Sequence, residues 1–148
     1  MPRSMSPDEV RAFLSAGTRT ARLATVMGSG APHVMPVWFV LDGDDLVFTT
    51  GRDTVKGRDL RRDGRVSIVV DDDRPPYAFV HLRGRAEVTE GAPDLLAWTT
   101  RLAARYMGEE RAEEYGLRNA VPDELLIRVT PRRIIAEDDV AGPGAHTA

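Results

Sequence analysis

Cysteine is absent from this chain of 148 residues, and lysine occurs only once, at position 56, among 20 basic residues. Without cysteine there is no disulfide framework, thiolate zinc site, iron–sulfur cluster or thiol nucleophile. The formal net charge is −3 and both signs are mixed along the chain, so no broad basic field is available to hold nucleic acid. We therefore expect no nucleic-acid partner.

Long apolar runs are also missing. No run approaches the roughly 18 residues that a membrane span needs, and the first seven residues lack the apolar core of a signal peptide. A chain of this length matches one ordinary domain. We expect a soluble, cytoplasmic protein without a membrane partner, forming one domain over residues 1–148 that is ordered from about 6 to 138 and flexible at 139–148.

Residues with the spacing of metal or hydrolase sites are scarce. His33, His81 and His146 do not form a metal-binding spacing, and the acidic run 71–73 lacks the alternating ligands of a calcium loop. The glycine-rich stretch 28–30 precedes a strand and has no P-loop lysine, so it is interpreted as a hairpin turn. We predict no metal site and assign no catalytic side chain.

Turn signals and hydrophobic periodicity divide the chain into strands and helices. Ser6, Pro7 and Glu9 are typical of a helix N-terminus with a capping box. Strands are predicted at 18–27, 32–41, 46–50, 65–70, 77–89 and 125–136, the last with a kink at Pro131. Helices are predicted at 6–16, 54–62 and 93–107, and a looser helical stretch at 109–116. These elements favour a mainly β (α+β) fold, a six-stranded and nearly closed antiparallel barrel with peripheral helices.

The run 77–89 alternates apolar and other residues with a period of two. Ala78, Val80 and Leu82 begin the face that we expect to be buried. Tyr77 and Phe79 lie on the opposite face, which exposes two aromatic rings.

Residues 49–65 combine several features of an anion site. A strand ends at Thr49 and Thr50, and a helix begins near Thr54, so the free N–H groups of its first turn point back toward the strand end. Lys56 adds a compact charge, and four arginines surround it: Arg52, Arg58, Arg61 and Arg62. The alternative interpretation is a solvated basic helix that balances Asp53, Asp59 and Asp63. Asp53, as the expected N-cap, argues mildly against a phosphate at the same helix end.

The same segment resembles the central motif of the pyridoxamine 5′-phosphate oxidase-like split β-barrel superfamily. The matching pattern is Phe48-x-Thr50-x-x-x-Thr54-x-Lys56-x-x-x-Leu60-x-x-Asp63-x-Arg65-Val66. Residues 31–39 are similar to the family strand that lies along the flavin ring system, and Leu82-x-Gly84-x-Ala86 matches the family's fifth strand. The resemblance implies a split β-barrel in which Thr54 and Lys56 contact the cofactor phosphate and Pro36, Val37 and Trp38 lie along its rings.

The P-x-W-F strand and the Arg-Arg-Asp after the lysine motif look most like the branch that binds the deazaflavin coenzyme F420. Coenzyme F420 carries a phosphodiester and an oligoglutamate tail, which arginines leading away from the phosphate suit; FMN, the alternative cofactor, ends in a compact phosphate monoester. The C-terminal segment lacks basic residues for a pyridoxamine substrate. The residues assigned to the cofactor are Pro36, Val37, Trp38, Thr49, Thr50, Arg52, Thr54, Lys56, Arg58, Arg62, Tyr77 and Phe79.

The resemblance further implies a homodimer with cofactor sites at the interface, where Tyr77 and Phe79 are contributed by the second chain. It implies hydride transfer from reduced F420 to a small conjugated or unsaturated substrate. Two alternatives remain open at this point: an FMN-binding flavin reductase of the same fold, and a carrier of flavin, deazaflavin or haem without turnover.

Overall fold

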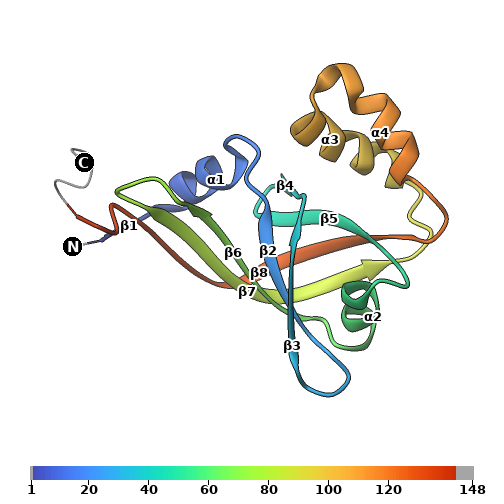
Figure 1. The fold of residues 1–148 in the computed structure, drawn as a ribbon, viewed down its shortest axis with the longest axis horizontal. Coiled ribbons are helices and arrows are strands. Elements are labelled where there is room, and N and C mark those ends of the chain that lie inside the picture. The colour runs from blue at the N-terminus through green and yellow to red at the C-terminus, as the bar shows by residue number, and fades with distance from the viewer. Residues whose placement is uncertain (1, 143–148) are drawn as a thin grey trace.

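The computed structural model describes residues 2–142, which form an antiparallel sheet with helices at its edges (Figure 1). The strands are β1 (Arg3–Ser4), β2 (Ala21–Val26), β3 (Pro32–Val37), β4 (Val40–Asp42), β5 (Asp45–Gly51), β6 (Arg65–Asp72), β7 (Ala78–Thr89) and β8 (Glu124–Asp138). The helices are α1 (Pro7–Ser15), α2 (Val55–Arg62), α3 (Leu95–Met107) and α4 (Ala112–Asn119), with a short 3₁₀ turn at Glu109–Arg111. The strand order is β3-β2-β6-β7-β8-β5-β4, and β1 pairs with β8.

The two ends of this strand order are joined by a very short connection. β3 ends at Val37 and β4 begins at Val40, although the two strands lie at opposite ends of the order. Three residues span at most about 10 Å, so the sheet must curl until its ends almost meet. The enclosed core contains Phe39, Phe48 and Ile127, each with no exposed surface. The predicted α+β barrel is therefore confirmed.

The strand count differs from the predicted six because one strand is divided and one is added. The run 32–41 breaks after Val37, where Phe39 bonds to α3 in place of a neighbouring strand. The Phe39 amide donates to Tyr106 Oη at 3.2 Å, and its carbonyl accepts from Arg105 Nη1 at 2.8 Å. Side chains of α3 thus take the place of inter-strand hydrogen bonds at Phe39, and the run is divided into β3 and β4.

The closing strand β8 is continuous through Pro131. Its register with β7 shifts between Arg83 and Gly84, so Pro131 pairs with Gly84 and Arg133 pairs with Arg83. Proline has no N–H for the ladder, and a bulge is where a strand accommodates that loss. A Cβ on Gly84 would lie 2.5 Å from the Thr130 carbonyl oxygen, so only glycine fits opposite this bulge.

Helix α1 has the predicted capping box, because the Ser6 side chain accepts from the Glu9 amide and the Glu9 side chain accepts from the Ser6 amide. On β7, the predicted burial of Val80 and Leu82 is confirmed.

Helix α3 packs Trp98 and Leu102 on the outer face of the sheet, against Val40, Val47 and Leu126.

Regular structure extends beyond the range 6–138 expected to be ordered. Arg3 pairs with Asp138, and the amides of Val140 and Ala141 donate to the carbonyls of Tyr77 and Pro76. His146 and the rest of the expected flexible tail after residue 142 lie outside the described residues. Within residues 2–142, no helix combines the length and apolar character that crossing a membrane requires.

Candidate functional site

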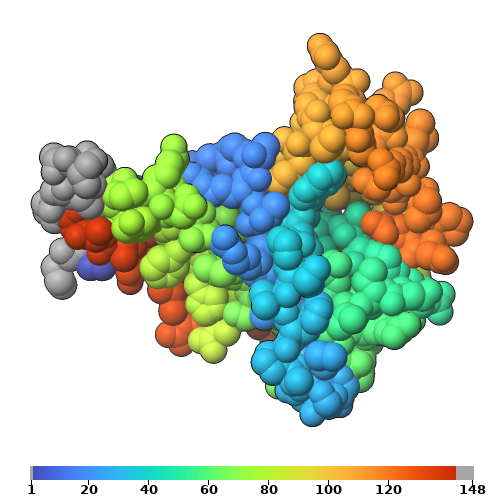
Figure 2. All heavy atoms as spheres, viewed as in Figure 1, coloured from blue at the N-terminus to red at the C-terminus, as the bar shows by residue number. Residues whose placement is uncertain are grey.

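A cavity of about 300 Å³ lies where the ends of β3 and β5 meet the beginning of α2. We call it the α2 cavity; its lining is Pro36, Val37, Trp38, Thr49, Thr50, Gly51, Thr54, Lys56, Leu102, Asn119 and Glu124. Figure 2 shows the blue and cyan β2–β3 hairpin beside the green segment that holds β5 and α2. Seven of the twelve residues assigned to the cofactor line this cavity: Pro36, Val37, Trp38, Thr49, Thr50, Thr54 and Lys56.

Helix α2 begins one residue later than predicted, with Thr54 rather than Asp53 as its N-cap. Thr54 Oγ1 accepts from the Gly57 amide at 3.1 Å and donates to the Gly51 carbonyl at 2.8 Å. It also lies 3.0 Å from Thr50 Oγ1. The short threonine side chain reaches N3 and thereby satisfies a free donor of the first turn. Asp53 is exposed and does not cap the helix, so its carboxylate does not occupy the helix N-terminus as expected.

These hydrogen bonds use the hydroxyl protons of Thr50 and Thr54 within the protein, so neither proton is free for a ligand. A hydroxyl has one proton, and that of Thr54 goes to the Gly51 carbonyl, which leaves Thr50 as the donor between the two hydroxyls. The amides of Val55 and Lys56 have no acceptor among residues 2–142. At the start of α2, the donors left for an anion are these two amides and the Lys56 ammonium, and of these two residues Lys56 lines the cavity.

Position 57, inside α2, requires glycine although glycine is a poor helix former. A Cβ at this position would lie 2.2 Å from the Gly51 carbonyl oxygen, a backbone atom that has no room to move. The helix loses roughly 1 kcal/mol relative to alanine at such a position. Because Gly57 has no Cβ, the first turn of α2 lies directly against the end of β5, and this brings Lys56 into the cavity.

Lys56 and Glu124 are the two charged side chains of the α2 cavity. Lys56 is half-buried and makes no ion pair with any residue in the described part of the chain. Thr49 Oγ1 donates to Glu124 Oε2 at 2.8 Å. Burial raises the pKa of the Glu124 carboxyl, while the Thr49 hydrogen bond and the Lys56 charge oppose this rise.

Glu124 was not identified from the sequence. It enters the cavity because β8 pairs with β5 so that Glu124 lies opposite Gly51, more than 70 residues earlier in the chain. A single acidic residue at the start of a strand carries no local signal of this pairing.

The predicted arginines do not line the cavity. Arg62 fastens α2 to the barrel, because it donates to the Val26 carbonyl at 2.6 Å and to Asp59 Oδ1 at 3.0 Å. Asp59 is buried and also accepts from Thr25 Oγ1 at 2.6 Å. Arg62 therefore has a structural role.

Two of the predicted arginines remain on the surface near the start of α2. Arg58 is exposed. Arg52 is also exposed, and its Nε lies 3.6 Å from Glu90 Oε1. Arg61, the fourth arginine of the segment, shares Glu90 at 3.9 Å and donates to the Arg52 carbonyl.

Tyr77 and Phe79 lie far from the α2 cavity within one chain. Tyr77 ends the β6–β7 turn and Phe79 is the second residue of β7; this turn lies at the end of the sheet away from α2 (Figure 1). Tyr77 has a φ of 67° and is 44% exposed. One chain thus does not bring these two rings together with Lys56.

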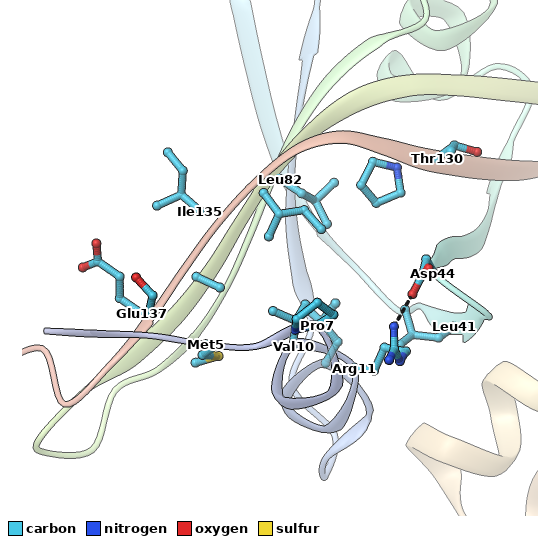
Figure 3. Close-up of a pocket in the computed structure, with 15 residues that line it drawn as sticks. Met5, Pro7, Val10, Arg11, Leu41, Asp44, Leu82, Thr130, Ile135 and Glu137 are labelled. Carbon is cyan, nitrogen blue, oxygen red and sulfur yellow. Dashed lines mark hydrogen bonds and ion pairs between the residues drawn. The ribbon is translucent and has the colours of Figure 1, made fainter.

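A larger cavity of about 630 Å³ lies between α1 and the β7–β8 ribbon (Figure 3). We call it the α1 cavity; Met5, Val10 and Leu82 contribute to its apolar lining, and an ion pair between Arg11 and Asp44 lies at its edge at 2.8 Å. None of the twelve residues assigned to the cofactor lines it. The α2 cavity is the better anion site, because Lys56, which makes no ion pair among the described residues, lines it at the start of a helix. Among the described residues there is no group of three or more potential metal ligands.

The fold is shared with known proteins. The chain resembles the crystal structure of a conserved hypothetical protein from Mycobacterium tuberculosis, with 28% identity, a TM-score of 0.80, and coverage of 97% of this chain and 95% of that one. A structure titled F420 reductase has 29% identity and a TM-score of 0.66, covering 84% and 94%. A haem-binding protein from Mycobacterium smegmatis has 25% identity and a TM-score of 0.66, covering 96% of this chain and 57% of its own.

Sequence comparison assigns the family directly. Among curated proteins, none matches the chain significantly. The family model described as pyridoxamine 5′-phosphate oxidase matches residues 6–137, which is most of the chain. The chain therefore belongs to the pyridoxamine 5′-phosphate oxidase-like split-barrel family.

Proposed function

We propose that this protein is an oxidoreductase that binds coenzyme F420 in the α2 cavity and reduces a small conjugated or unsaturated substrate. The observation that carries the proposal is that Lys56, on the first turn of α2, lines the same cavity as Pro36, Val37 and Trp38 at the end of β3. The family assignment and the similarity to an F420 reductase support a flavin-type cofactor.

The residues of the α2 cavity fit such a cofactor. Lys56 and the amides of Val55 and Lys56 would hold its phosphate, and the end of β3 would lie along its rings. Trp38 is held in place by stacking on Tyr106, with ring centroids 5.0 Å apart and an interplanar angle of 6°. Exposed Arg52 and Arg58 would attract an acidic tail.

When bound, reduced F420 supplies a hydride for an electrophilic carbon of the substrate. The protein's residues bind and orient the cofactor and keep water from its rings. We assign no acid or base among the side chains, because solvent supplies the proton.

Titration with F420 and with FMN, followed by fluorescence, tests the cofactor choice. We expect F420 to bind at least tenfold more tightly, a difference of about 1.4 kcal/mol. The reverse preference would favour an FMN-dependent flavin reductase and contradict the proposal. If F420 binds but its reduced form is not oxidised by any unsaturated acceptor, the protein is a carrier.

Haem is a less suitable ligand for this cavity, although two structural neighbours are titled as haem proteins. Haem iron takes an axial histidine, cysteine, methionine or tyrosine in proteins. None of these residue types is among the described residues that line the α2 cavity.

We further propose that the protein is a homodimer in which Tyr77 and Phe79 of the partner subunit complete the cofactor site. Tyr77 is exposed, and the β6–β7 turn that contains it lies at the opposite end of the sheet from α2, which contains Lys56 (Figure 1). Ile134 and Ile135, beside the α1 cavity, are 44% and 37% exposed, an apolar surface that a second copy would cover.

Tyr77→Ala is expected to weaken F420 binding by about 1 kcal/mol, roughly fivefold, because an aromatic contact is lost. Light scattering should give a dimeric mass for the wild type and for this variant. Tyr115→Ala is the control and should leave F420 binding unchanged; it removes a ring on α4 that contacts the guanidinium groups of Arg111 and Arg118. A monomeric mass for the wild type would exclude the shared site.

A further inference from the structure

A carboxyl group lies in the cavity that we assign to a phosphate. Glu124 lines the α2 cavity together with Lys56, and Thr49 fixes its orientation with the 2.8 Å hydrogen bond to Oε2. An acidic side chain repels an anionic ligand, so its presence beside the cation that attracts the ligand calls for a physical explanation.

The charges of the cavity are closely balanced. Lys56 contributes one positive charge, and ionised Glu124 contributes one negative charge. None of the nearby arginines lines the cavity: Arg62 pairs with Asp59, Arg52 lies 3.6 Å from Glu90, and Arg58 is exposed to solvent. Such a cavity has little positive charge available to compensate a second negative charge on a ligand.

Phosphate monoesters and diesters differ in the negative charge that they carry. A phosphate monoester carries about −1.5 to −2 at pH 7, because its second pKa is near 6. A phosphate diester has no second ionisation and carries −1. Repulsion from a carboxylate therefore acts more strongly on a monoester, and the partial burial of the cavity limits its screening by salt.

We propose that Glu124 is a specificity-determining residue that makes the α2 cavity favour phosphate diesters over phosphate monoesters. This inference rests on the proposed function, for which it supplies a physical basis: F420 contains a diester and FMN a monoester. The single negative charge of a diester is repelled less by the Glu124 carboxylate than the higher charge of a monoester, while the Lys56 ammonium attracts both.

The test compares the wild type with Glu124→Gln in titrations with F420 and with FMN. Glutamine has nearly the same shape, and its amide oxygen still accepts from Thr49, so circular dichroism should show an unchanged fold. We expect the dissociation constant for FMN to fall at least tenfold, while that for F420 changes less than threefold.

Asp123→Asn is the matched control. Asp123 precedes Glu124 and is exposed, and its side chain does not line the cavity, so this variant removes the same charge one residue away. We expect neither dissociation constant to change more than threefold. An equal FMN gain in both variants would mean that net charge acts at long range, and it would overturn the inference.

The outcomes separate this inference from the proposed function. If the wild type prefers F420 and Glu124→Gln does not strengthen FMN binding, only the inference fails. If the wild type prefers FMN, both fail. If it binds neither cofactor, the proposed function fails. The same variants are then titrated with a monoester, phenyl phosphate, and with a diester, methyl phenyl phosphate, and this comparison decides the inference. A gain confined to phenyl phosphate in Glu124→Gln supports it; no gain overturns it.

Discussion

Lys56→Ala should weaken F420 binding by about 1.5–3 kcal/mol, the range for losing a hydrogen bond to a charged group. Lys56 is half-buried, lines the α2 cavity and has no ion-pair partner in the described part of the chain. Its removal therefore breaks no ion pair among the described residues, although Glu124 loses the nearby Lys56 charge. Fluorescence titration with F420 measures the loss, and thermal unfolding should show a melting temperature close to that of the wild type.

Arg58→Ala is the control for this prediction, because Arg58 is an exposed cation two residues further along α2 that does not line the cavity. It should weaken binding by less than about 1 kcal/mol, as is typical of an exposed charge. Equal losses in the two variants would indicate general attraction of the anionic cofactor by the basic segment. Unchanged binding in Lys56→Ala would mean that the phosphate lies elsewhere.

Arg105→Ala should lower the free energy of unfolding by about 3–4 kcal/mol, because charge-assisted hydrogen bonds in a partly buried position are lost together. Arg105 donates to the Phe39 carbonyl at 2.8 Å and to the Leu14 carbonyl at 2.7 Å, and its guanidinium lies 4.6 Å from the centre of the Phe39 ring. It thereby connects α3 to the end of α1 and to the break between β3 and β4. Urea unfolding followed by circular dichroism measures the change.

Arg101→Ala on the preceding turn of α3 is the matched control for Arg105→Ala. Arg101 is exposed and donates one hydrogen bond, to the Leu41 carbonyl at 3.0 Å. Its loss should cost about 1 kcal/mol or less. If both variants unfold at the same urea concentration, the junction at Phe39 is held by core packing and not by Arg105.

Local chemistry made part of this site predictable. The strand that ends at Thr50, the helix that follows and the lone lysine on its first turn are all set by neighbours in sequence, so their arrangement could be inferred. Even here the cap was placed one residue early. Asp and Thr are both good N-caps, and only the contact of Thr54 with Gly51 and Gly57 distinguishes them.

Other parts of the site depend on contacts between distant segments. The run 32–41 looks like one strand because its residues suit a strand throughout. It is divided because Arg105 and Tyr106, more than 60 residues later, bond to the backbone of Phe39. Arg62 looked like a free cation, yet its partners Asp59 and the Val26 carbonyl hold it against β2.

The amino-acid sequence by itself determined the barrel class, the capping box of α1, the alternation of β7 and the anion-binding character of the start of α2, because each follows from periodicity or from residues a few positions apart. Only the tertiary structure decided which charges share the α2 cavity. The pairing of β5 with β8 places Glu124 opposite Gly51 and beside Lys56, while ion pairs hold Arg62 and Arg52 elsewhere. Electrostatic selectivity depends on distances in space, and strand register sets those distances.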